Sequence, residues 1–318
     1  MRRSTLPARI ITTVLALVLT PIALVLLSVG GQSVSQVFFE YGYRQDLSAV
    51  IGPMLVQTLG VVLLAVVVLS GVWSSAGLVA VGAFSVVALA LSAFPLALSW
   101  LYRFVPSPWI DGAVYGVPLA VLPVLGAMGL VLTRVRRDPR PRGAGLGALG
   151  IVLAPLLLAG GALLLSWGAA NGTLLALQRF QFDLQPLAVL ATLGGLLLIL
   201  AGVGVTHWSP FALVLPALVL LVGSIALALA PTAVFPILTS LPRGVNVVAP
   251  TLMLYGASAA AGVLFLVFTA VLLRVRAQAR LTPPEGTDAV AAAYPPAPYP
   301  AAYPAPGQHP FPPAPPAA

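Results

Sequence analysis

Cysteine and lysine are both missing from the 318-residue sequence, and charged residues of any kind are scarce. Without cysteine the chain has no disulfide, no thiol nucleophile and no thiolate metal site. Charged residues make up 7% of the chain, against about 25% in soluble globular domains. Hydrophobic residues make up 60%, and the mean hydropathy is +1.06. The composition excludes an ordinary soluble domain and predicts a membrane protein.

Eight apolar segments are long enough to cross a bilayer, which takes about 20 residues of helix. We therefore expect an all-α fold, a polytopic membrane helix bundle of eight transmembrane helices. The expected spans are 10–30, 51–69, 78–98, 113–132, 146–168, 187–205, 211–230 and 251–273. The second and third spans share one long apolar stretch, and the turn-forming residues 71–75 are the natural break. Residues 206–210 separate the sixth and seventh spans in the same way.

The distribution of arginine predicts the orientation of these spans. With eight spans, both termini lie on one side, and the segments on that side hold eleven of the fifteen arginines. Cytoplasmic loops carry the excess of basic residues, so both termini are expected in the cytoplasm. The segment after Arg2 and Arg3 also fits a secretory signal. Its apolar run of about 20 residues is longer than a typical signal core, so we expect an uncleaved first helix.

Two halves of the chain repeat a pattern at one constant offset. Arg103 is followed by Tyr115-Gly116 and then Arg134-Val-Arg136, and the same types recur at Arg243, at Tyr255-Gly256 and at Arg274-Val-Arg276. Apolar helices resemble one another by chance, but arginine, tyrosine and glycine in register do not follow from apolar composition. We expect two parallel four-helix repeats, 1–142 and 143–280, related by an axis along the membrane normal.

Four charged residues in the outer loops are the candidates for contact with a ligand or a lipid head group: Arg103, Arg243, Asp46 and Asp183. The arginines could hold an anionic head group or balance nearby acids. The aspartates could form an acid–base pair or bind a cation, but an acidic residue before a helix also favours the helix dipole, and we prefer that interpretation. We identify no catalytic, cofactor-binding or metal-ligating residues and expect no cofactor.

The last segment, 281–318, has a different composition, with thirteen prolines interleaved with alanine and tyrosine. Such a sequence cannot bury a core, and we expect a disordered cytoplasmic tail with polyproline-II bias. It is either a solvated spacer or a docking segment for a cytoplasmic protein partner.

The lysine-free, alanine-rich composition and the Pro/Tyr tail resemble uncharacterised multi-span membrane proteins of high-GC actinobacteria. That resemblance is one of composition and implies a plasma membrane but no activity. The leading hypothesis is a non-enzymatic structural or partner-organising protein, with membrane lipids as partners, homo-oligomers allowed and no nucleic acid. The alternatives are a permease-like component for a neutral or lipid-like solute and a membrane enzyme acting on a lipid-linked substrate.

Overall fold

The computed structural model describes residues 5–41, 48–137 and 144–281, which form α-helices joined by short turns. The described residues up to position 280 belong to one compact unit. The helices of the first half are α1 (Leu6–Tyr41), α2 (Ser48–Ser70), α3 (Ala76–Ala83), α4 (Ser85–Ala93), α5 (Pro95–Leu101), α6 (Ser107–Val114) and α7 (Val117–Arg137). Those of the second half are α8 (Ala144–Ala169), η1 (Ala170–Leu174), α9 (Leu175–Arg179), α10 (Pro186–Gly204), η2 (Val205–His207), α11 (Val214–Leu229), α12 (Pro231–Thr239), α13 (Val245–Leu254) and α14 (Ala257–Leu281).

Seven of the helical segments in the described part of the chain are long and apolar enough to cross a membrane. They are Leu6–Phe38, Ser48–Ser70, Ala76–Ala93, Val117–Arg137, Gly145–Arg179, Pro186–His207 and Ala257–Ala279. The pair α11 and α12 passes the same test together but bends by 119° between its helices, which makes an eighth candidate. The fold is thus an all-helical bundle with the architecture of a multi-pass membrane protein, and the expected breaks at 71–75 and 206–210 are both present.

Several span boundaries differ from those expected, because short helices occupy one end of the bundle. The expected span 113–132 begins instead at Val117, since Gly116 takes a φ of +85° and ends α6. Gly256, with a φ of +71°, likewise separates α13 from α14 inside the expected span 251–273. The expected span 78–98 is divided into α3, α4 and α5, and α1 continues to Tyr41, well beyond the expected end at position 30.

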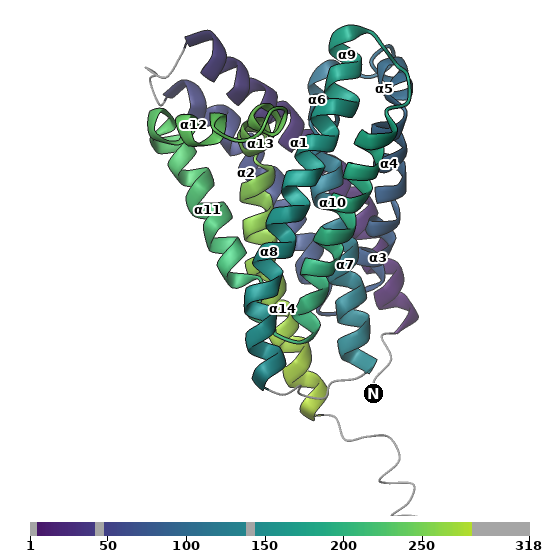
Figure 1. The fold of residues 1–318 in the computed structure, drawn as a ribbon. Helices are drawn as coiled ribbons and strands as arrows, with labels where there is room; N and C mark the ends of the chain where they lie inside the picture. The colour runs from purple at the N-terminus through teal and green to yellow at the C-terminus, as the bar shows by residue number, and fades with distance from the viewer. Residues whose placement is uncertain (1–4, 42–47, 138–143, 282–318) are drawn as a thin grey trace, which may run out of the picture. The chain divides into compact units, whose positions relative to one another are not determined.

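The short helices α5, α6, α12 and α13 gather at one end of the bundle, which we call the outer end after the predicted orientation (Figure 1). The start of α1 and the end of α14 lie at the opposite, inner end (Figure 1). The boundary at 142/143 between the expected halves, the segment with Arg140 and Arg142, and the whole tail after Leu281 lie outside the described residues.

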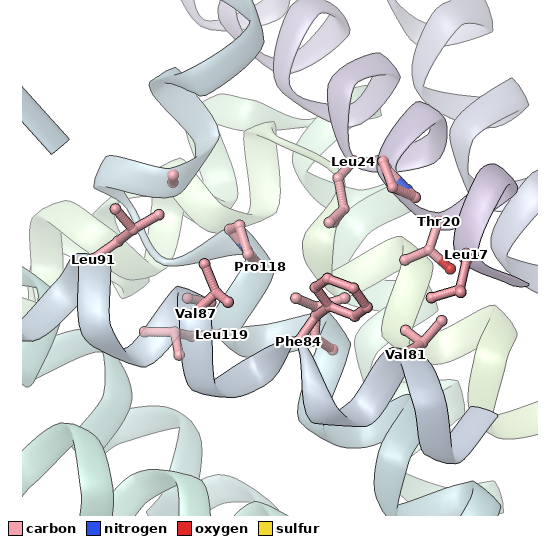
Figure 2. A pocket seen from close by; sticks show the side chains of 13 residues that line it. Leu17, Thr20, Leu24, Val81, Phe84, Val87, Leu91, Pro118 and Leu119 are labelled. Carbon is pink, nitrogen blue, oxygen red and sulfur yellow. The ribbon is translucent and has the colours of Figure 1, made fainter. Parts of the chain in front are cut away.

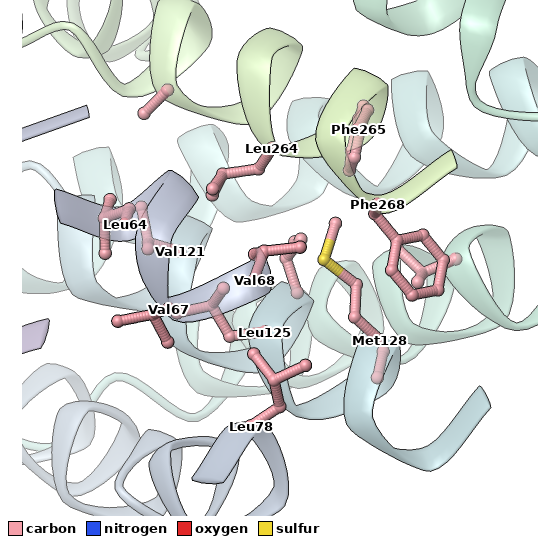
Figure 3. Packing of buried hydrophobic residues seen from close by; sticks show 14 of the residues in the cluster. Leu64, Val67, Val68, Leu78, Val121, Leu125, Met128, Leu264, Phe265 and Phe268 are labelled. Atoms are coloured by element: carbon pink, nitrogen blue, oxygen red, sulfur yellow. The ribbon is translucent and has the colours of Figure 1, made fainter. Parts of the chain in front are cut away.

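The centre of the bundle is an apolar seam between the two halves. Met128 of α7 and Phe268 of α14 are fully buried there, together with Leu125 and Leu264. Figure 3 shows these side chains converging from α7 and α14, with those of α2 packed beside them. Burying a side chain of this size contributes about 1.5–3 kcal/mol, so the seam is a principal source of cohesion between the halves.

Close helix contacts in the first half recur in the second. A Cβ added to Gly60 of α2 would lie 2.9 Å from the Ala23 carbonyl oxygen of α1, and one added to Gly195 of α10 would lie 2.8 Å from the Gly161 carbonyl oxygen of α8. The contacts thus match Ala23 with Gly161 and Gly60 with Gly195. Thr-Leu-Gly recurs at 58–60 and 192–194, so the sequence alone would align Gly60 with Gly194, one position before the match that the contacts give.

Gly30 and Gly168 extend the same correspondence. A Cβ on Gly30 would meet Pro53 and Gln57, and one on Gly168 would meet Ala188 and Thr192. The offset from Gly30 to Gly168 equals that from Ala23 to Gly161, and the α2 and α10 partners likewise keep the offset of Gly60 to Gly195. Small residues at these crossings let the two backbones approach closely, as in other membrane helix pairs. The pairs α1–α2 and α8–α10 therefore pack in the same way.

Candidate functional site: a carboxyl and tyrosine cluster at the outer end

Asp111 is the half-buried carboxyl group at the outer end, and two side chains donate hydrogen bonds to it. It lies on α6, a short helix whose start is fixed by Pro108 in its first turn. Gln32 of α1 donates through Nε2 over 2.6 Å, and the Tyr102 hydroxyl donates over 2.7 Å. The next residue, Gly112, donates its backbone N–H to the Ser28 hydroxyl over 2.9 Å. Ser28 and Gln32 lie one helical turn apart on one face of α1, so α6 is fastened to α1 at two adjacent points.

Tyr115 and Tyr255 complete this cluster, and they occupy equivalent positions in the two halves. Tyr115 follows α6 and precedes Gly116, whereas Tyr255 follows α13 and precedes Gly256. Their ring centroids lie 5.4 Å apart. Gly31 of α1 fits against the Tyr255 ring, where an added Cβ would stand 2.5 Å from two ring carbons. We call Gln32, Tyr102, Asp111, Tyr115 and Tyr255 the Asp111 cluster.

Burial and the Asp111 charge together set the protonation of the cluster. Burial raises the pKa of Asp111, and the hydrogen bond from Tyr102 opposes that rise. Burial, reinforced by the nearby carboxylate, raises the pKa of Tyr102, Tyr115 and Tyr255 above the usual value for a phenol. The three hydroxyl groups therefore keep their protons at neutral pH and remain available as donors.

The chemistry available to the cluster is limited by its residue types. One carboxyl group already accepts two hydrogen bonds, and the other members are an amide and three neutral phenols. Hard cations such as Ca²⁺ and Mg²⁺ are held by several oxygen ligands. Within the described residues, no three His, Asp or Glu side chains gather as a metal site would require. The geometry is that of a clamp that joins α1, α5–α6 and the start of α7.

The residues predicted to contact an outer-face ligand lie apart from this cluster. Arg103, Arg243 and Asp183 are all exposed, and Asp46 falls outside the described residues. Asp183 borders a cavity of about 10 Å³ beside Ser92 and Thr192, close to the smallest volume that holds one water molecule. The residue that caps the N-terminus of α10 is Gln185, and no side chain makes a capping hydrogen bond there. Ligand or head-group contact by these four residues stays a prediction.

A second arrangement, at the inner end, was not anticipated from the sequence. Arg136 donates to the carbonyl oxygens of Gly71 and Val72, the latter over 3.0 Å. Arg276 donates to the carbonyl oxygens of Thr206 and His207, each over 3.0 Å. Both guanidinium groups bond carbonyls at a helix end, either just after α2 or in the short helix η2 that follows α10, where no intrahelical donor exists. The repeated Arg-Val-Arg motif pointed to these positions but not to their partners.

Gln32, Tyr102 and Ser28 were missed because each is an ordinary polar residue near the end of an apolar run. The partners of Gln32 and Ser28 are also distant in the chain, whereas Tyr102 lies nine residues before Asp111. The recurring Tyr-Gly pairs drew attention to Tyr115 and Tyr255 but did not predict the contact between their rings. Comparison with protein-family models, with curated proteins and with solved structures found no match to this chain.

Proposed function

We propose that this chain is a non-enzymatic, structural or partner-organising protein of the plasma membrane. The observation that carries the proposal is the apolar seam at the centre of the bundle. Met128, Phe268 and their neighbours fill the space between α7 and α14, where a transporter would place its substrate path. The Tyr115–Tyr255 contact lies across the outer end of the bundle's centre. The seam side chains of Leu125, Met128, Leu264 and Phe268 have no solvent-exposed surface.

The repeated contacts support a duplicated architecture for this scaffold. In this proposal 1–142 and 143–280 are parallel four-helix repeats, with α11 counted as the seventh span. The recurrence of the Gly60 and Gly195 contacts and of the Arg136 and Arg276 hydrogen bonds supports it. With eight spans both termini share one side, and the eleven arginines there favour the cytoplasm.

The tail after Leu281 supplies the partner-organising part of the proposal. Its proline-rich sequence suits recognition by an aromatic-lined groove of a cytoplasmic protein. Membrane lipids are the other expected partners, and the bundle is also compatible with assembly into homo-oligomers. Truncation before Thr282 should remove a protein cross-linked through Tyr299 and leave the melting temperature of the detergent-solubilised bundle unchanged. A large fall in melting temperature would instead assign the tail to the bundle.

Single cysteines test the seam directly, because the native chain has no cysteine and gives no background. We expect Leu125→Cys and Phe268→Cys to resist a membrane-impermeant maleimide added to intact cells or to inverted vesicles. Arg103→Cys and Arg243→Cys, both exposed, should react in intact cells. Trp73→Cys, exposed in the turn between α2 and α3, should react only in inverted vesicles.

The outcomes separate the proposal from its alternatives. Reaction of either seam cysteine would reveal a water-filled path between the halves and would favour the permease-like alternative. Reaction of Trp73→Cys in intact cells would contradict the proposed orientation but would not bear on whether the seam is closed to water. An enzyme acting on a lipid-linked substrate would need its reactive side chains at one site. Asp111 instead bonds Tyr102 in the Asp111 cluster, whereas Asp183 borders the small cavity beside Thr192.

A further inference from the structure

A pocket of about 210 Å³ opens on the side of the first half, away from the seam. Leu17 and Thr20 of α1 form one wall, Phe84 lies at the junction of α3 and α4, and Pro118 and Leu119 of α7 form the floor (Figure 2). The volume exceeds that of an engineered apolar cavity of about 150 Å³ that admits benzene. The pocket is thus large enough for a small apolar molecule or a short stretch of chain.

The helix geometry of the first half creates this pocket. At Gly82 and Gly126, α3 touches α7, since a Cβ on Gly82 would lie 2.3 Å from the Gly126 Cα atom. The helix is interrupted at Phe84, and α4 beyond it has no buried residue in this structure. Phe84 itself is 52% exposed. The wedge left between α4, α1 and α7 is the pocket.

Thr20 is the polar side chain among the residues that line the pocket, and its hydroxyl has no hydrogen-bond partner within the described chain. The residue is 2% exposed. In Figure 2 its side chain is directed into the space beside Leu17 and Val81. Other buried threonines differ: the Thr192, Thr251 and Thr269 hydroxyls each donate to the carbonyl one helical turn earlier. An unmade hydrogen bond at a buried group costs about 1–3 kcal/mol.

A carbonyl acceptor lies on the same wall of the pocket. Pro21 follows Thr20 and has no N–H, so it cannot donate to the Leu17 carbonyl as a helix interior normally requires. Leu17 and Pro21 both line the pocket. Freed carbonyls in membrane helices are normally satisfied by another group nearby. The pocket therefore combines apolar walls with a hydroxyl and a carbonyl on one side.

We propose that this pocket binds a neutral, apolar ligand that carries a hydroxyl group, of the long-chain alcohol class. Its hydroxyl would accept a hydrogen bond from the Thr20 hydroxyl and donate one to the Leu17 carbonyl. The lining side chains carry no charge, which disfavours an ionised fatty acid. Thr20 also lies near the middle of the candidate span Leu6–Phe38, far from phospholipid head groups. A plain acyl chain would fill the pocket and contact its apolar walls, but it would leave the Thr20 hydroxyl without a hydrogen-bond partner.

The experiment uses octanol bearing a diazirine as the probe, with the full chain reconstituted in phosphatidylcholine vesicles. After photolysis, mass spectrometry of peptides should place adducts on the α1, α3–α4 and α7 residues that line the pocket. Unlabelled octanol should compete, and octane at the same membrane concentration should compete less. Loss of one hydrogen bond corresponds to about fivefold weaker binding, so Thr20→Val should lower the labelling about fivefold.

Matched variants distinguish binding from misfolding. Thr269→Val makes the same replacement at a buried threonine of α14 and should leave the labelling unchanged. Thr20→Ser retains the hydroxyl and should be labelled as strongly as the wild type. Ala88→Leu should fill the pocket and abolish the labelling. Equal labelling of wild type and a folded Thr20→Val protein would overturn the proposal in favour of simple filling by acyl chains. Adducts found only outside the pocket would overturn it as well.

Discussion

Tyr115 and Tyr255 lie against each other at the outer end of the bundle, with ring centroids 5.4 Å apart and ring planes inclined by 41°. They hold matching positions in the two halves, and each follows a short helix and precedes a glycine with positive φ. Two equivalent residues related by a twofold axis can touch only close to that axis. The contact is therefore where a duplicated bundle would place its axis, and it joins the two halves directly.

The first prediction is that these two rings stabilise the fold jointly. An aromatic pair contributes about 0.5–1.5 kcal/mol beyond the area that it buries. In a double-mutant cycle with Tyr115→Leu and Tyr255→Leu, the coupling energy should fall in that range. Unfolding of the detergent-solubilised protein by sodium dodecyl sulfate, followed by tryptophan fluorescence, supplies the free energies. Strict additivity of the two replacements would show that the rings do not support each other.

Much of the helical architecture follows from the apolar runs alone. The breaks at 71–75 and 206–210 are predictable because glycine, serine and polar residues interrupt long stretches of leucine, valine and alanine. The short outer helices are not predictable in this way. The apolar α5 overlaps the end of the expected span 78–98, whereas α12 lies in the loop expected after the span 211–230. The 119° bend between α11 and α12 falls at Ala230, which has a φ of −138° and directly precedes Pro231.

The candidate site was less predictable than the spans. Asp111 is one of seven acidic residues in the chain, but its donors carry no distinguishing pattern: Gln32 precedes it by 79 residues and Tyr102 by nine. A hydrogen bond between residues as far apart as Gln32 and Asp111 leaves no periodic pattern in one sequence. The lateral pocket was also invisible, because it arises from the divergence of α4 after Phe84 rather than from a motif.

The second prediction concerns the two equivalent glycines of the helix crossings. Gly60→Ala and Gly195→Ala should each lower the free energy of unfolding by about 1–3 kcal/mol, because the added Cβ would meet backbone atoms that cannot move aside. Gly52→Ala and Gly204→Ala face open space and should be neutral or stabilising by up to about 1 kcal/mol. The same detergent titration measures all four. A tolerated Gly60→Ala alongside a disruptive Gly195→Ala would count against equivalent packing in the two halves.

The third prediction concerns the arginines at the inner end. Arg136→Ala and Arg276→Ala each remove two hydrogen bonds to carbonyls at a helix end. A hydrogen bond to a charged group contributes about 1.5–3 kcal/mol, and partial solvent exposure places the expected loss toward the lower figure. Arg134→Ala and Arg274→Ala remove the same charge from exposed neighbours and should change stability by less than about 0.5 kcal/mol. Equal effects at all four sites would assign the loss to net charge.

The fourth prediction is a pH dependence that originates at Asp111. Burial raises the pKa of this carboxyl in the folded protein, so the folded state holds the proton more tightly than the unfolded chain does. The resulting stabilisation is complete below the ordinary carboxyl value of 3.8 and is lost as the pH rises through the raised value. Wild type should therefore gain stability relative to Asp111→Asn as the pH falls from neutral toward that ordinary value.

Asp111→Asn is the suitable comparison because its amide oxygen can still accept the hydrogen bond from Tyr102 while the side chain no longer titrates. The quantity to measure is the difference in unfolding free energy between wild type and variant at each pH. Asp183→Asn removes a negative charge at an exposed position and controls for net charge. If wild type instead loses stability relative to Asp111→Asn as the pH falls, the hydrogen bonds to the ionised carboxylate outweigh the cost of its burial. The Asp111 cluster would then be a clamp held by charge, and Tyr102→Phe should weaken it most at neutral pH.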